Sequence, residues 1–574
     1  MPDTSSIHIN AGGKAANTFD AIVIGSGISG GWAAKELCEQ GLKTLVLERG
    51  RDVQHLTDYP TMHLHQWQLP HRGQITQQQR LQNPLISKAA GYDEATRHFF
   101  VNDADHPYIQ QKPFDWIRGY QVGGKSLIWG RSCQRWSDWD FSAPLRYGYA
   151  TDWPIRYKDI APWYSHAEKF IGVCGTYENI EAMPDGEFLP GMEFNAVEKQ
   201  FKKAIWDKYQ RHYIPGRWAH ITQTQPIHIA QGRGQCQNRD LCMRGCPYGG
   251  YFSSNTSTLP WAQKTGNLTI RPHAVVHSII YDEQLGKATG VRVIDAQTKQ
   301  ATEFFARIIF VNASALNSNL ILLNSTSRRF PNGLGNDNGL LGKYICFHNY
   351  RGSMNAEFDG LQNWYHSAKR AAECVIPNFR NLKQQDTDFL GGYVIFSGGY
   401  RRRLYYENPD GFGAGYKEAL AQPGPWGMYM YMQGETIPKA TNQVWLSKDK
   451  KDGYGMPLLV TSVGYDDNDE KMLQDFLQQG RQMFETAGAK NIQVHDSGQA
   501  PGLDIHEMGG VRMGRDAASS LLNQWNQLHH CKNVFVTDGA CMTSTGNQSP
   551  SILYMAFTAR AASYAVQQLK KQNL

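Results

Sequence analysis

The sequence has no long apolar run. No stretch of 18 or more apolar residues occurs in its 574 residues, whereas a membrane-spanning helix needs about 20. The opening segment, MPDTSSIHINAGGKAANTFD, contains neither a basic region nor an apolar core, so it lacks the pattern of a signal peptide. We therefore expect a chain with no transmembrane segment and no export signal of its own.

A strong excess of one charge is also missing. The chain has 58 Lys and Arg against 52 Asp and Glu, a net charge of +6, and its longest basic run is only Arg401–Arg403. A nucleic-acid-binding surface needs a denser basic patch, so we predict no nucleic-acid partner. With 41% hydrophobic and 19% charged residues, the composition is that of a globular protein. The length predicts two joined domains.

Cysteine is too sparse for a disulfide scaffold, because only ten cysteines are spread over 574 residues. Three of them cluster in GQCQNRDLCMRGCPYGG, residues 234–250, with the spacing C-x5-C-x3-C and a proline after the third. The others are expected to be ordinary buried thiols: Cys38, Cys133, Cys174, Cys346, Cys374, Cys531 and Cys541.

What the sequence does contain is a βαβ unit near its start. FDAIVIG, from Phe19, is a short β-branched apolar run that is typical of a buried parallel strand. GSGISGGWAAKELCEQG then predicts a glycine-rich turn and a helix, and TLVLERG predicts a second strand. Residues 306–325 again read as strand, turn and helix, as does NVFVTDGA with the long helical pattern after it. Residues 268–294 alternate like antiparallel strands with a hairpin.

Residues 346–495 differ from this pattern, because they are rich in aromatics and contain runs such as WGMYMYMQGE, which favour an antiparallel sheet. We therefore predict an α/β fold, α+β overall. A Rossmann-like domain would be assembled from the discontinuous segments 19–345 and 496–574, and residues 346–495 would form an inserted antiparallel-sheet substrate domain. Residues 1–18 are expected to be an N-terminal arm.

Gly25, Gly27 and Gly30 form the pattern G-x-G-x-x-G between the first predicted strand and helix. The first glycine permits a tight turn, the second lets the backbone approach a pyrophosphate, and the third allows close packing of helix on strand. The helix N-terminus offers unpaired N–H groups to the phosphates. Glu48 ends the second strand, where a carboxylate can accept from a ribose hydroxyl. The motif alone does not separate FAD from NAD, but its place near the N-terminus and the C-terminal NVFVTDGA favour FAD.

Several stretches, in their order and spacing, resemble the glucose–methanol–choline (GMC) oxidoreductases: GYQVGGKSLIWG, NASALNSNLILLNS, HEMGGVRMG and VTDGACMTSTGNQSPSILYMAFTARAA. The resemblance runs from about Phe19 to the C-terminus and is weakest between residues 346 and 495. It implies FAD-dependent oxidation of an alcohol in a two-domain fold. The resemblance also implies further residues around the cofactor. Gly123, Gly124 and Ser126 would lie along the flavin ring and the pyrophosphate. The backbone of Val275 or Val276 would meet the adenine, and Asp538 and Gly539 would close the cofactor site.

Alcohol oxidation needs a base for the hydroxyl proton and an acceptor for a hydride, and the pKa of histidine suits the first task. His506 opens HEMGGVRMG, the position of the catalytic histidine in the family that the chain resembles. The family usually adds a second His or Asn directly before a proline, which hydrogen-bonds the alcohol oxygen. Here Ser549 precedes Pro550, and Asn547 lies two residues earlier. We expect Asn547 or Ser549 to assist His506; the alternatives are a helix cap or an impaired site.

Cys236, Cys242 and Cys246 allow several interpretations. A structural zinc site commonly uses four ligands in C-x2–4-C pairs, which this spacing fits poorly unless a histidine joins. A disulfide would leave one thiol over. Thiolates followed by proline are typical of iron–sulfur segments. The run resembles catalytic subunits of FAD-dependent sugar dehydrogenase complexes, and this resemblance implies a [3Fe–4S] cluster.

The same resemblance implies the reaction and the partners. GKSLIWGRSCQRWSDWDF is most similar to enzymes that oxidise the C3 hydroxyl of glucosides to 3-keto sugars. Such subunits work with a small export subunit and a cytochrome c, which implies periplasmic localisation by co-export; a cytoplasmic protein is the alternative. A flavin oxidase that uses oxygen, or an electron-transfer subunit with impaired alcohol oxidation, stays open. Faces for a sugar ring could come from aromatics of the inserted segment: Trp364, Tyr365, Trp426, Tyr429 and Tyr431.

Overall fold

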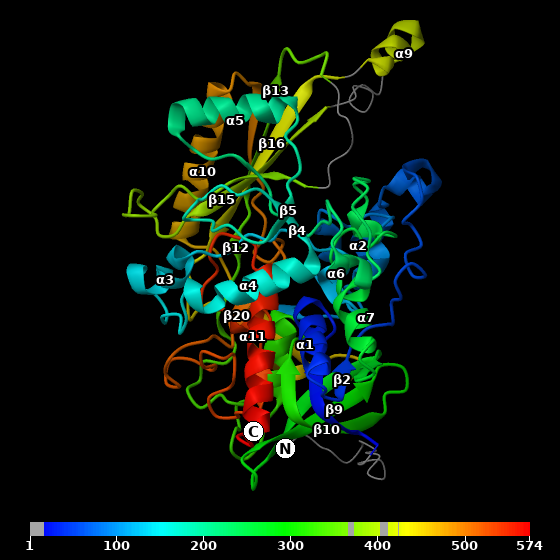
Figure 1. Cartoon of the computed structure of the whole chain (residues 1–574), viewed down its shortest axis with the longest axis vertical. Coiled ribbons are helices and arrows are strands. Elements are labelled where there is room, and N and C mark those ends of the chain that lie inside the picture. The colour runs from blue at the N-terminus through cyan, green and yellow to red at the C-terminus, as the bar shows by residue number, and fades with distance from the viewer. Residues whose placement is uncertain (1–15, 365–371, 402–410, 423) are drawn as a thin grey trace.

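The structure is a computed structural model that describes residues 16–364, 372–401, 411–422 and 424–574. Most of the predicted N-terminal arm and Tyr365 therefore lie outside the described residues. In Figure 1 the molecule is elongated along the vertical axis, and two bodies of sheet and helix lie one above the other. The cofactor elements predicted from the sequence fall in the lower body, and the aromatic segment falls in the upper one.

A seven-stranded sheet lies in the lower body. In spatial order its strands are β7 (Leu268–Arg271), β2 (Thr44–Leu47), β1 (Thr18–Ile24), β10 (Ala301–Val311), β9 (Lys287–Asp295) and β8 (Ala274–Asp282), with β21 (Val534–Val536) beside the end of β10. Strands β7, β2, β1, β10 and β21 are parallel, and β8 and β9 form an antiparallel hairpin. This confirms the Rossmann-like prediction.

One strand differs from the expectation. Residues 268–271, predicted to be antiparallel from their alternation, form β7, which pairs in parallel with β2. Because β7 is an edge strand of the sheet, it is only partly buried. Its alternation therefore reflects its edge position and not its direction.

Helices cover this sheet. Figure 1 shows α1 (Ile28–Glu39) and α11 (Ser551–Lys570) side by side, and the two helices are in contact. Thirteen of the 20 residues of α11 are buried, among them small residues such as Ala556, Ala559 and Ala562 that permit close packing. Further helices of this part are α2 (Gln77–Gln82), α3 (Asp138–Tyr147), α4 (Tyr157–Ile171), α6 (Pro226–Ala230), α7 (Thr258–Gln263) and α8 (Ala315–Asn324), with the short 3-10 turns η6 (Gly124–Leu127), η7 (Cys242–Arg244) and η10 (Gly539–Cys541).

The upper body contains a second seven-stranded sheet. Its strands are β19 (Lys490–Asp496), β13 (Gly352–Phe358), β16 (Trp426–Glu435), β15 (Tyr393–Arg401), β14 (Cys374–Ile376) and β6 (Ile214–Pro215), with β12 (His348–Asn349) paired to β16. All these pairs are antiparallel. The helices α5 (Ala196–Tyr209) and α10 (Asp467–Thr486) pack on it. The helix α9 (Gly413–Ala421) extends from the top of the molecule in Figure 1.

β16 shows how the sequence pattern makes this sheet two-sided. Met428, Met430 and Met432 pack into the core beneath α5 and α10. Tyr429 and Tyr431, which alternate with these methionines, line a cavity on the opposite face. Because side chains of a strand alternate between faces, WGMYMYMQGE places its methionines against helices and its tyrosines toward the cavity.

The segment predicted as the inserted domain does not form this body alone. β6 and α5, from residues 196–215, join its sheet and core. Conversely, β17 (Gln443–Lys451) and β18 (Pro457–Ser462) belong to a five-stranded sheet with β11 (Lys343–Cys346), β20 (Met508–Gly510) and β3 (Ile109–Gln110). A two-stranded sheet, β4 (Val173–Gly175) with β5 (Phe188–Pro190), completes the strands described here.

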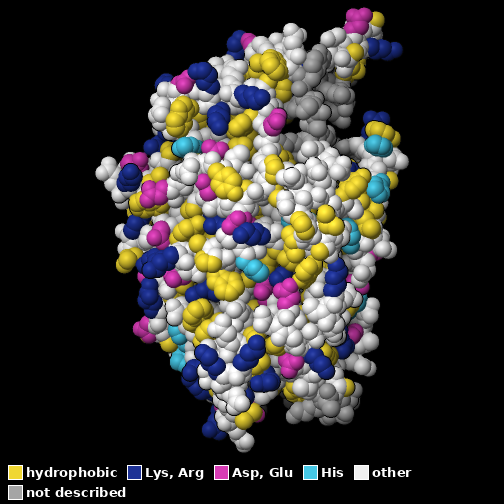
Figure 2. Space-filling view, in the orientation of Figure 1, with side chains coloured by type: hydrophobic (Ala, Val, Ile, Leu, Met, Phe, Trp, Pro, Cys, Tyr) yellow, Lys and Arg dark blue, Asp and Glu magenta, His cyan; other side chains and the backbone are white. Residues whose placement is uncertain are grey.

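The surface gives no sign of a dense basic patch on the face shown in Figure 2. Lysine and arginine side chains are scattered there among acidic and apolar ones. Within the described part of the chain, none of the helices is both long enough and apolar enough to cross a membrane.

Candidate active site and cofactor cavity

The glycine-rich turn lies between β1 and α1 and has the geometry that its motif requires. Gly25 has a φ of +98°, and a Cβ there would lie 2.3 Å from the carbonyl oxygen of Asn312. A Cβ on Gly30 would lie 1.9 Å from the carbonyl oxygen of Gly25. A Cβ on Gly27, in contrast, would meet no atom of the described residues within 4 Å. Gly25 and Gly30 are therefore required by packing, whereas Gly27 leaves room on the cavity side, where a pyrophosphate would approach.

Glu48 directly follows β2 and lies beside this turn. Its carboxylate accepts from the N–H of Ser26 at 3.1 Å, from the Ser26 hydroxyl at 2.5 Å and from the N–H of Gly50 at 2.9 Å. Burial raises the pKa of the Glu48 carboxyl above its usual range. Glu48 also lines the cavity, and a carboxylate has about four lone-pair sites, so it can still accept from a ribose hydroxyl.

A second turn, leading into η6, packs against the first. Gly123 has a φ of +93°, and a Cβ there would lie 1.6 Å from the side-chain oxygen of Asn255. A Cβ on Gly124 would lie 3.2 Å from the Cα of Gly27, so the two turns touch. The Ser126 hydroxyl donates to the carbonyl of Gly123 at 2.5 Å. Gly124 and Ser126 line the cavity, and Gly123 is packed behind them.

Two further segments border the cavity. Val275 and Val276 contribute to it from β8. Asp538 follows β21, caps η10 with one carboxylate oxygen, and accepts from the Ser318 hydroxyl with the other at 2.5 Å. Burial raises the pKa of Asp538 to about 6. Asp538 and Gly539 both line the cavity, so every residue predicted to contact the cofactor except Gly30 and Gly123 faces one space.

This cavity has a volume of about 1590 Å³, which exceeds the roughly 300–1,000 Å³ of a pocket for a drug-sized ligand. It extends from the glycine-rich turn to His506 and to the aromatic face of β16. A glycine turn without side chains at a helix N-terminus, an adjacent carboxylate and this volume fit FAD together with a substrate.

His506 lines the cavity, and a second histidine lies behind it. The Nδ1 atoms of His506 and His348 are 3.0 Å apart, and the rings are nearly perpendicular. The Nε2 of His348 lies 3.1 Å from the carbonyl oxygen of Gly546. Burial, reinforced by His348 and Lys125, holds the pKa of His506 well below its usual range. His506 is therefore a neutral imidazole at neutral pH, which is the form that can accept a proton.

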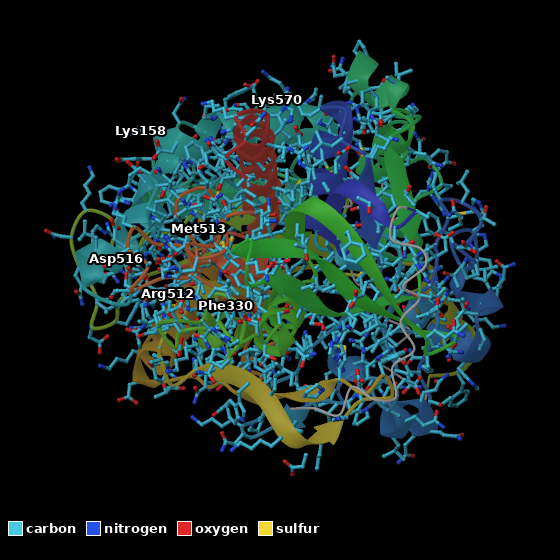
Figure 3. All side chains as sticks on the ribbon, turned by 90° about the horizontal axis from the view of Figure 1, so that it is seen from below. Lys158, Phe330, Arg512, Met513, Asp516 and Lys570 are labelled. Atoms are coloured by element: carbon cyan, nitrogen blue, oxygen red, sulfur yellow. The ribbon has the colours of Figure 1, made fainter. Side chains whose placement is uncertain are left out.

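The rest of the HEMGGVRMG segment anchors this histidine in the core. Figure 3 labels Arg512 and Met513 within the body of the molecule, whereas Lys158 and Lys570 lie toward its rim. Met513 is fully buried, and the guanidinium of Arg512 lies 3.8 Å from the ring centroid of Tyr344. The segment thus holds His506 from a rigid part of the fold, which favours precise placement of a base.

The two predicted helpers of His506 point to different places. Ser549 lines the cavity, and its hydroxyl has no hydrogen-bond partner among the described residues. Pro550 is the N-cap of α11, so Ser549 does not cap this helix. Asn547 instead donates its side-chain amide to Glu435 at 3.1 Å and borders a separate small cavity. The structure therefore brings Ser549, and not the Asn547 side chain, to the cavity of His506.

The aromatic residues predicted to contact a sugar ring also lie in different places. Trp364, Tyr429 and Tyr431 line the cavity, whereas Trp426 is buried in the core beneath α5 and α10. Glu373, which the sequence did not reveal, accepts from the Tyr429 hydroxyl at 2.8 Å and from the Tyr431 hydroxyl at 2.6 Å. Glu373 also lines the cavity, so a carboxylate and aromatic faces meet there.

The three clustered cysteines lie at another border of the same cavity. Cys236 lines it, the Cys242 sulfur lies 3.7 Å from Nε2 of His220, and the Cys246 sulfur accepts from the N–H of Gly250 at 3.4 Å. Burial raises the pKa of the Cys236 thiol to about 11 and also raises the pKa of Cys242. All ten cysteines are free thiols, and the seven predicted to be buried are buried.

The surroundings of these thiols carry buried donors without partners. Arg131 Nε and Nη1, Arg233 Nη2 and His220 Nδ1 are buried and have no hydrogen-bond partner among the described residues. Unsatisfied buried donors are costly, and an anionic group between them would satisfy some of them. The cysteine segment thus has the donor set that a thiolate-bound, negatively charged metal group requires.

His348, Glu373 and His220 were not found from the sequence. His348 and Glu373 lie in the segment where the resemblance is weakest, and His220 lies sixteen residues before Cys236. The signals that one sequence offers, periodicity and spacing, do not mark any of these three residues, because each acquires its role only through contacts in the folded chain.

Comparison with known proteins finds similarity to GMC oxidoreductases. Two family profiles, both described as GMC oxidoreductase, match residues 223–349 and 438–558. The 2-methyl-1,2-propanediol dehydrogenase of Mycolicibacterium austroafricanum is 28% identical over 96% of this chain and 95% of its own length. The fructose dehydrogenase large subunit of Gluconobacter japonicus is 25% identical, over 96% and 98%. The structure of a formate oxidase variant from Aspergillus oryzae shares the fold, with a TM-score of 0.60, 12% identity, and coverage of 97% and 99%.

Proposed function

Because the chain belongs to the GMC oxidoreductases, FAD-dependent enzymes that act on CH–OH groups, we propose that it oxidises a secondary hydroxyl of a sugar or glycoside. The best candidate is C3 of a glucoside, with a 3-keto sugar as the product. The observation that carries this proposal is a single cavity bordered by the dinucleotide turn, His506, the Glu373–tyrosine face and Cys236. These are the parts that a sugar dehydrogenase with an electron outlet requires.

In this mechanism His506 accepts the hydroxyl proton of the substrate at Nε2, because Nδ1 is engaged with His348. The carbon bearing that hydroxyl loses its hydrogen as a hydride, and a carbonyl forms. FAD, when bound, supplies the acceptor of the hydride. Ser549 faces the same space and can donate to the alcohol oxygen as negative charge develops on it.

The substrate face supports a polyhydroxylated ligand. Both oxygens of Glu373 accept from tyrosine hydroxyls, which fixes the carboxylate in place at the cavity wall. Tyr431 also stacks on Phe396 at a centroid distance of 5.3 Å. Aromatic faces beside a fixed carboxylate suit a sugar ring, which offers both apolar C–H faces and hydroxyl donors. A similar relative, the fructose dehydrogenase large subunit, is named for a sugar substrate.

We propose further that Cys236, Cys242 and Cys246 hold a [3Fe–4S] cluster. Sulfurs bound to one zinc at about 2.3 Å lie within about 4.6 Å of one another. Among the described residues, the group of three ligand atoms found within 4.8 Å of each other is His348, Asp504 and His506, not the cysteines. The absence of the three sulfurs from such a group disfavours a single zinc ion among the described residues. The [3Fe–4S] cluster would supply a one-electron outlet for the electrons taken from the substrate.

The partners follow from this proposal. Electrons leaving through the cysteine segment would reach a cytochrome c or a quinone, and a small signal-bearing subunit would export the folded chain to the periplasm. Part of the support is that a similar relative is itself named as a large subunit. Co-expression with a candidate small subunit from the same genome, followed by fractionation, tests this localisation; a chain that stays in the cytoplasm whenever that subunit is present would contradict it.

The reaction is tested by anaerobic mixing of the purified protein with a panel of glycosides. We expect bleaching of the flavin absorbance by at least one glycoside, a 3-keto product, and an EPR signal of the cluster that changes on reduction. Peroxide formation and oxygen consumption at the same turnover rate, without any added dye, would instead establish the oxidase alternative. A fully FAD-loaded protein that no sugar bleaches would support the electron-transfer alternative.

A further inference from the structure

His348 is placed so that it can determine which nitrogen of His506 carries the proton. It is fully buried, belongs to the short strand β12, and lies behind His506 as seen from the cavity, which it does not line. Its two ring nitrogens meet different groups: Nδ1 lies 3.0 Å from Nδ1 of His506, and Nε2 lies 3.1 Å from the carbonyl oxygen of Gly546. Both distances are within hydrogen-bonding range.

The chemistry of these partners fixes the protons. A carbonyl oxygen only accepts hydrogen bonds, so Nε2 of His348 must carry a hydrogen. A neutral imidazole has one N–H, and Nδ1 of His348 is then an acceptor. Its partner, Nδ1 of His506, must therefore be the donor. It follows that Nε2 of His506 carries a lone pair, and this nitrogen has no hydrogen-bond partner among the described residues.

We propose that His348 is a positioning residue that holds His506 in the Nδ1–H tautomer, with the lone pair of Nε2 directed to the substrate. The proposal rests on the proposed role of His506 as the base. The Gly546 carbonyl can only accept, and it therefore fixes the proton positions of this arrangement. Gly546 lies three residues before Ser549, whose side chain also lines the cavity. The same short segment would thus orient the base and supply a donor to the substrate oxygen.

The groups around the pair are consistent with a neutral His348. Among the described residues no hydrogen bond joins its ring to a carboxylate, and the nearby Asp504 accepts through one oxygen from the backbone N–H of His348 at 2.8 Å. Burial lowers the pKa of His348 to about 4 and raises the pKa of Asp504 to about 7. Lys125, which also acts on His506, is paired with Glu507 at 3.1 Å.

Two variants of His348 separate this role from a purely structural one. Asn places an amide oxygen where Nδ1 lies and keeps an acceptor for His506, whereas Gln places its amide near Nε2 and keeps only the bond to Gly546. We expect His348→Gln to lower the rate constant of flavin reduction about 100-fold, and His348→Asn to lower it no more than about tenfold. The apparent Kd for the substrate and the FAD content should change little in both.

His228 provides the matched control. It is buried, both of its ring nitrogens have partners, and it does not line the cavity. We expect His228→Gln to alter the melting temperature at most, and to leave the rate constant of flavin reduction unchanged. Equal losses in His348→Asn and His348→Gln, or a loss in His228→Gln of the size seen in His348→Gln, would overturn the proposal.

A second readout needs no turnover and therefore holds even if the substrate proposal fails. In holoenzyme labelled with 15N in its histidine rings, the His506 signals, assigned by their loss in His506→Asn, should show a protonated Nδ1 and an unprotonated Nε2. In His348→Gln the two nitrogens should approach the averaged shifts of a freely exchanging ring. A protonated Nε2 in the parent protein would refute the proposal. So would a stoichiometric metal ion bound by His348, Asp504 and His506 in metal analysis, because it would occupy the nitrogen lone pairs.

Discussion

Asn547 donates its side-chain amide to the carboxylate of Glu435 at 3.1 Å, and the pair is buried beside the cofactor cavity without facing it. Glu435 lies at the end of β16, the strand whose tyrosines line the cavity. Burial, with the nearby Asp140 carboxyl as a smaller cause, raises the pKa of Glu435 to about 7. The Asn547–Glu435 pair therefore ties the segment before α11 to the substrate sheet.

Replacement of Glu435 by glutamine should stabilise the protein at high pH. The folded pKa is about 7 against an ordinary value of 4.5, so the folded state holds more protons than the unfolded state between these values. Stability from this group is full below pH 4.5 and is lost as pH rises through 7, by up to about 3 kcal/mol. Glu435→Gln removes this loss and can still accept from Asn547. Urea unfolding should show a much larger gain at pH 8 than at pH 5; an equal gain at both would contradict the assignment.

Replacement of Ser549 by alanine and replacement of Asn547 by alanine should have different effects on rate and stability. Ser549 lines the same cavity as His506, so Ser549→Ala should lower the rate constant of flavin reduction roughly tenfold or more at unchanged melting temperature. Asn547→Ala removes a buried hydrogen bond and should cost about 1–3 kcal/mol of stability, with a smaller kinetic effect. Stopped-flow reduction and thermal unfolding measure the two effects. The reverse pattern would make Asn547 the helper.

Gly27 and Gly30 should behave differently although both belong to one motif. Gly27→Ala meets no protein atom within 4 Å, so the folded chain should accept it, but the methyl group would occupy space that a pyrophosphate needs. We expect FAD affinity to fall roughly tenfold to hundredfold, from about 1–3 kcal/mol of overpacking. Gly30→Ala places a Cβ 1.9 Å from a carbonyl oxygen and should lower the melting temperature as well. FAD content of the purified variants and their unfolding curves test this; intact FAD binding in Gly27→Ala would place the pyrophosphate elsewhere.

Removal of one clustered thiol should uncouple electron exit from substrate oxidation. Cys236→Ala, Cys242→Ala and Cys246→Ala should each lose iron while anaerobic bleaching by the sugar continues. Turnover with an external cytochrome should fall with the iron content. Cys531→Ala, which changes a buried thiol whose sulfur lies 3.6 Å from Asn533, serves as the control and should keep both. Iron-free parent protein that still reduces the cytochrome at full rate would eliminate the cluster from the route.

The pH dependence of flavin reduction should show no protonation step near 6.5. Because burial holds the pKa of His506 well below that value, the base stays neutral as pH falls from 8 to 6. Its proton-accepting form is lost only below the lowered pKa, so the rate constant should be nearly constant across that range. Substrate affinity measured in parallel separates binding from chemistry. Asp504, beside the histidine pair, has a pKa raised to about 7, so an apparent pKa of 6.5 or above that persists in Asp504→Asn would show that the base is not buried as described.

Local patterns were enough to predict the cofactor elements. The βαβ unit, the strand before Asp538 and the last helix each carry their signal within about thirty residues, because hydrophobic periodicity and glycine spacing are local properties. The run WGMYMYMQGE likewise predicted an antiparallel strand, but Trp426, expected beside Tyr429 and Tyr431, packs with the methionines on the opposite face.

The groups that complete the site could not be predicted in this way. His348 is separated from His506 by 158 residues, and Glu373 from Tyr431 by 58. Such contacts arise only from the order of strands in the second sheet, which one sequence does not encode as a motif. The departure at Ser549 shows the same limit: the sequence left Asn547 and Ser549 equivalent, and only the position of Glu435 draws Asn547 away from the cavity.

The participation of β6 and α5 in the substrate sheet has a practical consequence for exchanging specificity between relatives. If only residues 346–495 were transferred, the recipient's own residues 196–215 would have to pack against the transferred sheet. Val197, Phe201 and Ile205 of the recipient would then contact methionines and aromatic residues from a different protein. A functional chimera must therefore carry both pieces, two separate inserts in one gene, if the transplanted binding face is to keep its shape.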